Sequence, residues 1–217
     1  MVLTSVQKRK NKVTLRFNTS EEIEISYEIY LNSGLYKDDK VDRKKVNQLI
    51  LQNDLFLVKN SAFRYLSNRN HSSSEIKVKL RKKGFDIEII NSVIKELKEK
   101  EYIDDFKFAE SFVKFRIERR NEGLVKIHSE LIKRGITSEI ISDVISKFKD
   151  DIVLFNNAQS LGEKKYQSLK DKSLEFQKLK GRLFNFLKSK GYTIDIIIKV
   201  VDDILKKDNY NEPDNYS

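Results

Sequence analysis

One pattern of glycine and apolar residues occurs three times in this chain, and it constrains the fold more than any other feature of the sequence. The three copies are anchored on Gly84, Gly135 and Gly191. The positions eight and four before each glycine, and one, five, six, nine, ten and thirteen after it, are apolar in every copy. Agreement at so many positions, with a period of about 50 residues, predicts three structural repeats.

The spacing within each copy is that of two helices joined at the glycine. Apolar residues four apart before the glycine, and in pairs after it, lie on one face of an α-helix. A glycine adopts the left-handed conformation in which many helices end at no steric cost. Asp86, Thr137 and Thr193 follow two residues later and are good N-cap types, so a new helix is predicted to begin there.

The start of the helix before each glycine is marked less evenly. Ser72 and Glu75 have capping-box spacing in the first copy. Gly123 is a weaker cap in the second copy, and Leu179 in the third does not cap. A further helix is expected ahead of each pair, over residues 60–69, 104–120 and 151–166. Each repeat is then a three-helix unit that buries little surface alone, so the repeats are expected to stack into an elongated array.

The N-terminal part follows a different pattern. Apolar and polar residues alternate over 13–17 and again over 23–27, with a turn signal between them, which predicts a β-hairpin. Asp42 is a candidate cap for a helix over 43–58. The fold class is therefore mainly α, with tandem three-helix repeats and a small N-terminal segment that contains a β-hairpin. The expected divisions are 1–58 (hairpin and helix), 59–103, 104–149 and 150–207 (repeats), and 208–217 (polar tail).

Composition narrows the classes of partner and chemistry. The formal net charge is +10, which suits an anionic partner such as nucleic acid, an acidic protein face or a membrane surface. The chain has no cysteine, which excludes disulfides and thiolate chemistry. No signal peptide is recognisable, and no apolar run approaches the ~20 residues of a membrane span. We expect a soluble cytoplasmic protein that does not associate with membranes.

Little in the sequence indicates catalysis or a cofactor. His71 and His128 are the only histidines, and their positions do not suggest a metal site. Asp104 and Asp105 could form an acid pair, but an N-cap with a first-turn acid explains them better. A phosphate-binding loop and a nucleophile elbow are both missing from the sequence. We therefore expect no enzyme activity, no cofactor and no metal.

Basic residues remain as the candidate binding site, at equivalent places in successive repeats. In stacked repeats they could form a positive stripe that suits a polyanion or an acidic groove. Lysines near helix C-termini also complement the helix dipole, so either explanation is open for those beside the glycines. The candidate residues are Lys77, Lys79, Arg81, Lys82, Lys83, Arg116, Arg119, Arg120, Lys126, Lys133 and Arg134. The third repeat has Lys178, Lys180, Arg182, Lys188 and Lys190 in similar places.

Residues 60–148 resemble the RecX family, regulators of the bacterial recombinase RecA. The segments "AFRYLSNRNHSSSEIKVKLRKKGF", "VIKELKEKEYIDDFKFAESFVKFR" and "GLVKIHSELIKRGI" carry the resemblance. The residues on the family pattern are Ala62, Tyr65, Leu66, Arg69, Ser72, Glu75, Lys83, Gly84, Asp104, Asp105, Phe108, Ala109, Gly123, Ile127, Glu130, Leu131, Gly135 and Ile136. The chain departs from the pattern at Ile76, Glu101 and Arg134, and its third repeat lacks the D-D-x-x-F-A motif.

The resemblance implies tandem three-helix repeats and a regulatory role in DNA repair, recombination and the SOS response. It further implies binding along the helical groove of RecA filaments on DNA, inhibition of recombinase and ATPase activity, and weak binding to single- or double-stranded DNA. We expect such a protein to act as a monomer. The alternative is a helical module that binds DNA directly without sequence specificity, because its lysine-rich helices position a backbone rather than read bases.

Overall fold

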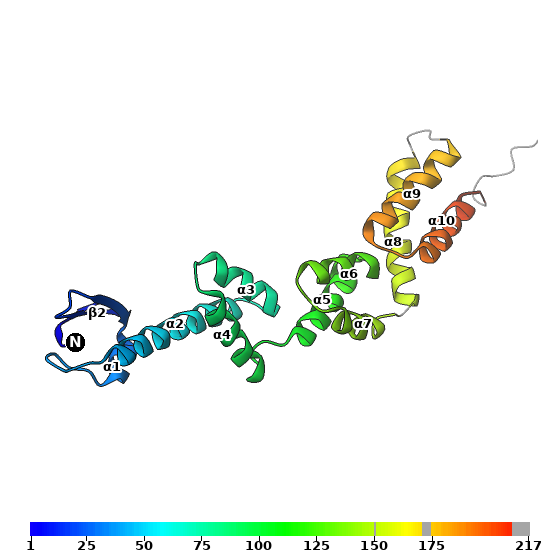
Figure 1. The fold of residues 1–217 in the computed structure, drawn as a ribbon. Coiled ribbons are helices and arrows are strands. Elements are labelled where there is room, and N and C mark those ends of the chain that lie inside the picture. Colours follow the sequence, from blue (N-terminus) through cyan, green and yellow to red (C-terminus); the bar gives the residue numbers. More distant parts are fainter. Residues whose placement is uncertain (150, 171–174, 210–217) are drawn as a thin grey trace, which may run out of the picture. The chain divides into compact units, whose positions relative to one another are not determined.

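Ten helices and one small sheet make up the described part of the chain in a computed structural model (Figure 1). The structure describes residues 1–149, 151–170 and 175–209, so most of the predicted polar tail lies outside it. The chain divides into two units, Met1–Ile103 and Asp104–Ser217. The predicted mainly α fold with three-helix repeats and a small N-terminal β segment is confirmed.

Three antiparallel strands form the N-terminal sheet in the order β1-β2-β3: β1 is Leu3–Arg9, β2 is Lys12–Phe17 and β3 is Glu22–Ser26. The predicted hairpin is β2–β3, where Val13 pairs with Ile25 and Leu15 with Ile23. These four residues are buried on one face because alternate side chains of a strand share a face. A short helix α1, Tyr27–Ser33, follows the sheet.

A single long helix, α2 (Arg43–Leu66), follows where the sequence suggested two helices over 43–58 and 60–69. Asp42 caps it as predicted, since its carboxylate accepts a hydrogen bond from the Lys45 amide at 2.7 Å. The chain has neither glycine nor proline near position 59 to stop the helix. Val46 packs in the core of the sheet, whereas Val58 and Ala62 pack in the core of the first repeat.

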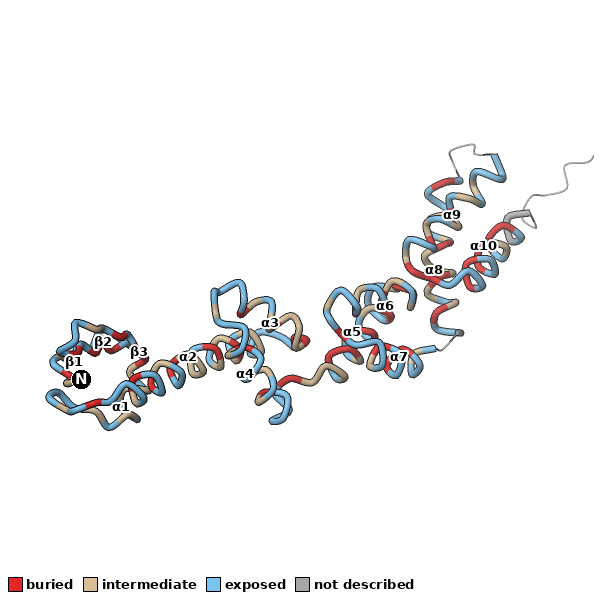
Figure 2. The backbone as a smooth tube through the Cα atoms, viewed as in Figure 1, coloured by how far each residue is buried: buried red, intermediate tan, exposed pale blue. Residues whose placement is uncertain are grey.

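The first repeat combines the end of α2 with α3 (Ser73–Lys82) and α4 (Ile87–Glu99). Its two caps are those read from the sequence: Ser72 Oγ accepts from the Glu75 amide at 3.1 Å, and Asp86 accepts from the Glu88 amide at 2.8 Å. Gly84 joins α3 to α4 with a φ of +85°, as the turn requires. Figure 2 shows the buried residues along the faces that the three helices turn to one another.

The second repeat contains α5 (Asp105–Arg120), α6 (Leu124–Lys133) and α7 (Ser138–Ser146). Asp104 is the N-cap of α5 and accepts a hydrogen bond from the Lys107 amide at 2.9 Å, so its predicted capping role is confirmed. The third repeat contains α8 (Asp151–Lys170), α9 (Phe176–Lys190) and α10 (Ile194–Asn209). Leu179 lies inside α9, which begins earlier than the sequence suggested.

Repeats two and three share one hydrophobic core and a backbone contact between their glycines. The Gly123 amide donates to the Lys190 carbonyl at 2.9 Å, and the Val125 amide donates to the Gly191 carbonyl at 3.0 Å. The turn of the third repeat thus caps the N-terminus of α6. A Cβ on Gly123 would lie 2.1 Å from the Gly191 oxygen. The presence of glycine at position 123 is therefore explained by the close approach of Gly191, which leaves no space for a side chain, rather than by capping.

Candidate partner-binding surfaces

The basic residues of α3 lie on two flanks of the helix rather than on one. Ile76 and Leu80 face the core. At 100° per residue, Lys77 and Arg81 fall on one flank and Lys79 on the other. Arg81, Lys82 and Lys83 are exposed, whereas Lys77 and Lys79 are half-buried. Among the described residues, none of the five cations of α3 and its C-cap has an acidic partner within ion-pair distance. These cations are Lys77, Lys79, Arg81, Lys82 and Lys83.

Two of these lysines lie against an aromatic ring of the preceding helix. The Lys79 ammonium is 4.9 Å and the Lys83 ammonium 5.2 Å from the centre of the Tyr65 ring. We call the place where the first two helices of a repeat meet, with its ring and two cations, the seam of that repeat. In repeat one the seam is Tyr65, Lys79 and Lys83.

The seam of repeat two is built from two arginines, and one of them is paired with acids. The guanidinium carbons of Arg116 and Arg134 each lie 4.8 Å from the centre of the Phe112 ring. Arg116 also pairs with Glu122 at 2.8 Å and with Glu130 at 3.7 Å. Arg116 therefore has two internal acidic partners, while Arg134 contacts the same ring.

The other four predicted cations of repeat two differ in whether they have an acidic partner. Lys126 pairs with Glu122 at 3.0 Å, and Lys133 pairs with Glu130 at 3.4 Å. Arg119 and Arg120 are exposed at the end of α5. Arg120 lies 5.9 Å from the centre of the Phe115 ring, which is itself 51% exposed. The set is Arg119, Arg120, Lys126 and Lys133.

Repeat three has a seam of its own, which the sequence reading found only in part. Lys165 of α8 and Lys190 of α9 lie 5.6 Å and 5.4 Å from the centre of the Phe186 ring. Lys190 is one of the basic residues that the sequence singles out, whereas Lys165 and Phe186 are not. Two other predicted cations are paired: Lys178 with Glu175 at 3.2 Å and Lys180 with Asp202 at 3.0 Å.

A second basic surface lies at the turn between β1 and β2 and is not among the predicted binding residues. Arg9 and Lys10 are exposed at the turn between β1 and β2. Lys8 lies 3.5 Å from the centre of the Tyr27 ring. The run "QKRKNK" is the feature of the sequence that could have predicted this surface.

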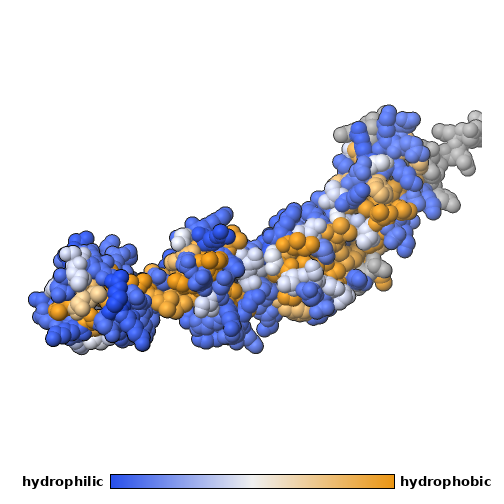
Figure 3. All heavy atoms as spheres, viewed as in Figure 1, coloured by the Kyte–Doolittle hydropathy of each residue, from blue (hydrophilic) through white to orange (hydrophobic). Residues whose placement is uncertain are grey.

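On the face drawn in Figure 3, hydrophilic residues cover much of each unit, and apolar residues gather in smaller patches.

His71 belongs to a polar cluster at the start of α3 rather than to a metal site. Its Nδ1 lies 2.8 Å from Glu75 Oε2, and Arg69 approaches the same oxygen at 3.1 Å. Burial lowers the pKa of His71 below its ordinary value, the hydrogen bond that its imidazole donates to Glu75 acts against this, and the charge of Arg69 adds to the lowering. No group of three or more histidine or acidic residues in the described ranges could hold a metal ion.

Acid is expected to destabilise the first repeat through His71. Because the folded-state pKa of His71 is lowered, the unfolded chain binds more protons, and stability rises with pH. The contribution is complete above the unfolded-state pKa of about 6.5 and is lost as pH falls below it. Urea unfolding at pH 7 and pH 5 should show a smaller loss of stability for His71→Gln than for the native chain. An equal loss in both proteins would contradict this assignment.

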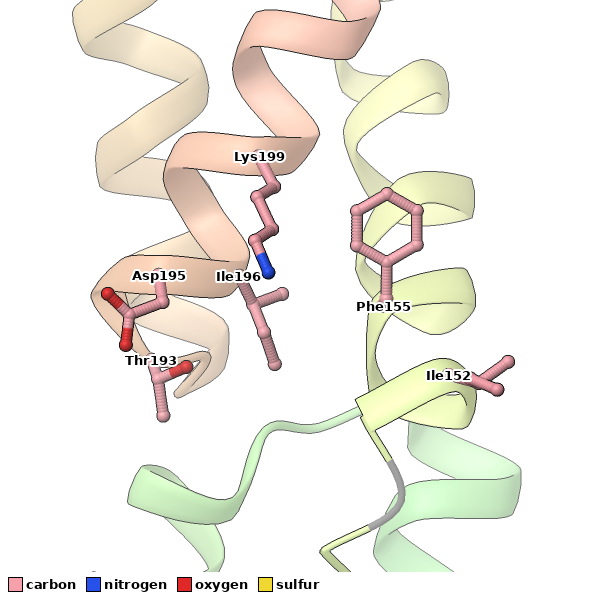
Figure 4. Close-up of a pocket in the computed structure, with 6 residues that line it drawn as sticks. All are labelled: Ile152, Phe155, Thr193, Asp195, Ile196 and Lys199. Carbon is pink, nitrogen blue, oxygen red and sulfur yellow. The ribbon is translucent and has the colours of Figure 1, made fainter.

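The third repeat has an open hollow of about 580 Å³ beside α8 and α10 (Figure 4). Ile152, Phe155 and Ile196 supply apolar surface, and Thr193, Asp195 and Lys199 complete the lining. These six side chains do not combine a nucleophile with a base in the arrangement that covalent catalysis requires. None of the helices in the described ranges is long and apolar enough to cross a membrane.

These features define a class: a helical-repeat protein in which each repeat has two cations beside an aromatic ring. Models of the first, second and third three-helix domains of RecX match residues 59–97, 104–145 and 153–201. The chain belongs to the RecX family of regulatory proteins.

Individual relatives cover most of the chain. It is 32% identical to a regulatory protein RecX of Clostridium perfringens (strain SM101), over 90% of this chain and 92% of the relative. It is 28% identical to the RecX of Clostridium acetobutylicum, over 94% of both chains. A crystal structure of a regulatory protein RecX superposes with a TM-score of 0.72 at 20% identity, covering 93% of this chain and 98% of that one. RecX from Lactobacillus salivarius gives 0.63 at 24% identity, covering 71% and 99%. The two superpositions support the same fold.

Proposed function

We propose that this protein is a non-enzymatic regulator that binds RecA filaments assembled on DNA and inhibits their recombinase and ATPase activities. Membership of a family of regulatory proteins supports this role. We place the protein in the cytoplasm, as a monomer, acting in DNA repair and recombination and in the SOS response. The three repeats, 59–103, 104–149 and 150–207, are its binding units, and 1–58 is an N-terminal accessory segment.

The observation that carries the proposal is the set of exposed cations that the protein does not pair internally. Arg81, Lys82, Arg119 and Arg120 are exposed and have no acidic partner within ion-pair distance among the described residues. Leaving such charges unpaired adds nothing to folding, whereas an acidic groove would attract them. Several modest contacts along one filament add up because each contact raises the effective concentration of the next.

Charge reversal tests this surface. The quadruple variant with Arg81, Lys82, Arg119 and Arg120 changed to Glu should need at least about tenfold more protein for half-inhibition of RecA ATPase on single-stranded DNA. Its far-UV circular dichroism should match that of the native chain. The control reverses four other exposed lysines, Lys44, Lys95, Lys107 and Lys114, and should inhibit normally. Full inhibition by the first variant would reject the proposed surface.

A second candidate function is direct DNA binding, and the basic turn between β1 and β2 favours it. Arg9 and Lys10 extend the positive surface beyond the repeats. Titration with duplex and single-stranded DNA at two salt concentrations separates the candidates, since phosphate contacts weaken steeply with salt. Tight binding to DNA without RecA, abolished by Arg9→Glu with Lys10→Glu, would favour the second candidate.

A further inference from the structure

The same arrangement of one ring and two cations recurs at the seam of all three repeats. One cation is always the residue just before the glycine, namely Lys83, Arg134 or Lys190. The ring comes from the first helix in repeats one and two and from the second helix in repeat three. Because different sequence positions supply the same constellation, it marks a property of the seam rather than of one helix.

Repeat two shows what such a seam accepts. The Glu130 carboxylate lies 3.7 Å from Arg116, and the Glu122 carboxylate lies 2.8 Å from it. At the position that Glu130 occupies in its repeat, repeat one has Lys79 and repeat three has Phe186. The chain itself thus fills the second seam with carboxylates.

The cations in the seams of repeats one and three have no carboxylate partner of this kind. Among the described residues, Lys79, Lys83, Lys165 and Lys190 have no carboxylate within ion-pair distance. Each ring attracts its ammonium groups weakly, while the two like charges on it repel each other. A carboxylate placed between the two ammonium groups would relieve the repulsion and form charge-assisted hydrogen bonds.

We propose that the seams of repeats one and three each bind a carboxylate side chain of an acidic protein partner, as the seam of repeat two binds Glu130. This inference rests on the proposed function in that the partner is the filament protein rather than its DNA. A partner built of repeating subunits presents the same acidic group more than once, which suits two equivalent seams in one chain. The seam of repeat two is occupied from within and does not take part.

The surroundings of the first seam favour a single carboxylate over a nucleic-acid backbone. Glu75 lies one helical turn before Lys79 and is committed to Arg69 and His71. A continuous row of phosphates, one for each ~3.4 Å of strand, would be brought up to this fixed negative charge. One acidic side chain carries a single negative charge and therefore meets less of this repulsion than a row of phosphates does.

The test uses the full-length chain and a probe that contains carboxylates but no phosphate. Poly-L-glutamate of about 20 residues is titrated while NMR follows the lysine side-chain ammonium groups, with an oligothymidylate of equal charge in parallel. Lys83→Gln should lower the affinity of the repeat-one seam for poly-L-glutamate about tenfold, Lys190→Gln should do the same at the repeat-three seam, and Lys83→Arg should retain the native affinity. Lys114→Gln, at an exposed position on α5 with no seam role, should change it little. Oligothymidylate binding should fall equally in all three glutamine variants.

The outcomes separate this inference from the proposed function. Unchanged poly-L-glutamate affinity in the Lys83→Gln and Lys190→Gln variants would overturn the seam sites, whatever the filament does. A selective loss of oligothymidylate binding in these variants would assign the seams to DNA and also overturn the inference. If poly-L-glutamate binding falls as expected but the native chain does not bind RecA filaments, the carboxylate sites stand and the proposed partner fails.

Discussion

Replacing Gly123 by alanine should destabilise the unit Asp104–Ser217 by about 3–4 kcal/mol, a large effect for the addition of one methyl group. The backbone at Gly123 has a φ of −79°, which any residue can adopt. The added Cβ, however, would lie 2.1 Å from the Gly191 oxygen. The turn of the third repeat must therefore move away, and the hydrogen bonds to the Lys190 and Gly191 carbonyls are lost. Urea unfolding followed by circular dichroism measures the change.

Two further variants isolate the cause. Serine is at least as good an N-cap as glycine, so Gly123→Ser would be neutral or stabilising if capping alone mattered. The contact with Gly191 predicts a loss close to that of the alanine variant. Gly84→Ala is the conformational control, because Gly84 has a φ of +85° and open space around it, and it should cost only about 1–2 kcal/mol. If the Gly123→Ser protein were as stable as the native chain, Gly123 would not be in contact with the Gly191 turn in solution.

Local features of the fold followed directly from the sequence. The caps Asp42, Ser72, Asp86 and Asp104 were readable because a cap depends on residues within one turn of the helix. The glycine turns and the apolar helix faces could be predicted for the same reason. Because the pattern occurs in three repeats, the prediction for each repeat was supported by the same pattern in the other two. The hairpin β2–β3 followed from strict alternation of apolar and polar residues.

Features that depend on contacts between distant segments could not be read in this way. Gly123 was interpreted as a weak cap, because nothing near it in the sequence indicates that Gly191 lies against it. The continuity of α2 was missed because an apolar pattern split between two cores gives no single helical stripe: Val46 faces one core and Val58 the other. Charge alone also could not show which candidate cations have internal partners, since the sequence does not reveal that Arg116 is paired with Glu122.

Tyr192 illustrates how the junction of repeats two and three is closed by polar groups as well as by apolar ones. Its hydroxyl donates a hydrogen bond to the Asn121 carbonyl at 2.7 Å. Burial raises the pKa of Tyr192 above its ordinary value, and the nearby carboxylate of Glu122 raises it further. The phenol thus stays protonated as a donor throughout the neutral range. The same Glu122 pairs with Arg116, so the seam of repeat two and the junction with repeat three share one carboxylate.

Asn53 should behave as the attachment point between the N-terminal sheet and α2. It is buried in the middle of a helix, where its Oδ1 accepts hydrogen bonds from the amide of Ser26 at 2.8 Å and from its hydroxyl at 2.9 Å. Asn53→Leu keeps the size but leaves two buried donors without an acceptor, which should cost the unit Met1–Ile103 about 2–3 kcal/mol.

Ser26→Ala with Asn53→Leu removes one of those two donors and should therefore recover part of the loss. Hydrogen exchange locates the effect, because the amides of β3 should lose protection in Asn53→Leu while those of α4 keep most of theirs. The sheet is tied to this helix at the place where α2 passes from the core of the strands to the core of the first repeat. If Asn53→Leu unfolded at the same urea concentration as the native chain, with β3 protected as before, the apolar contacts between α2 and the sheet would be enough to hold the sheet in place.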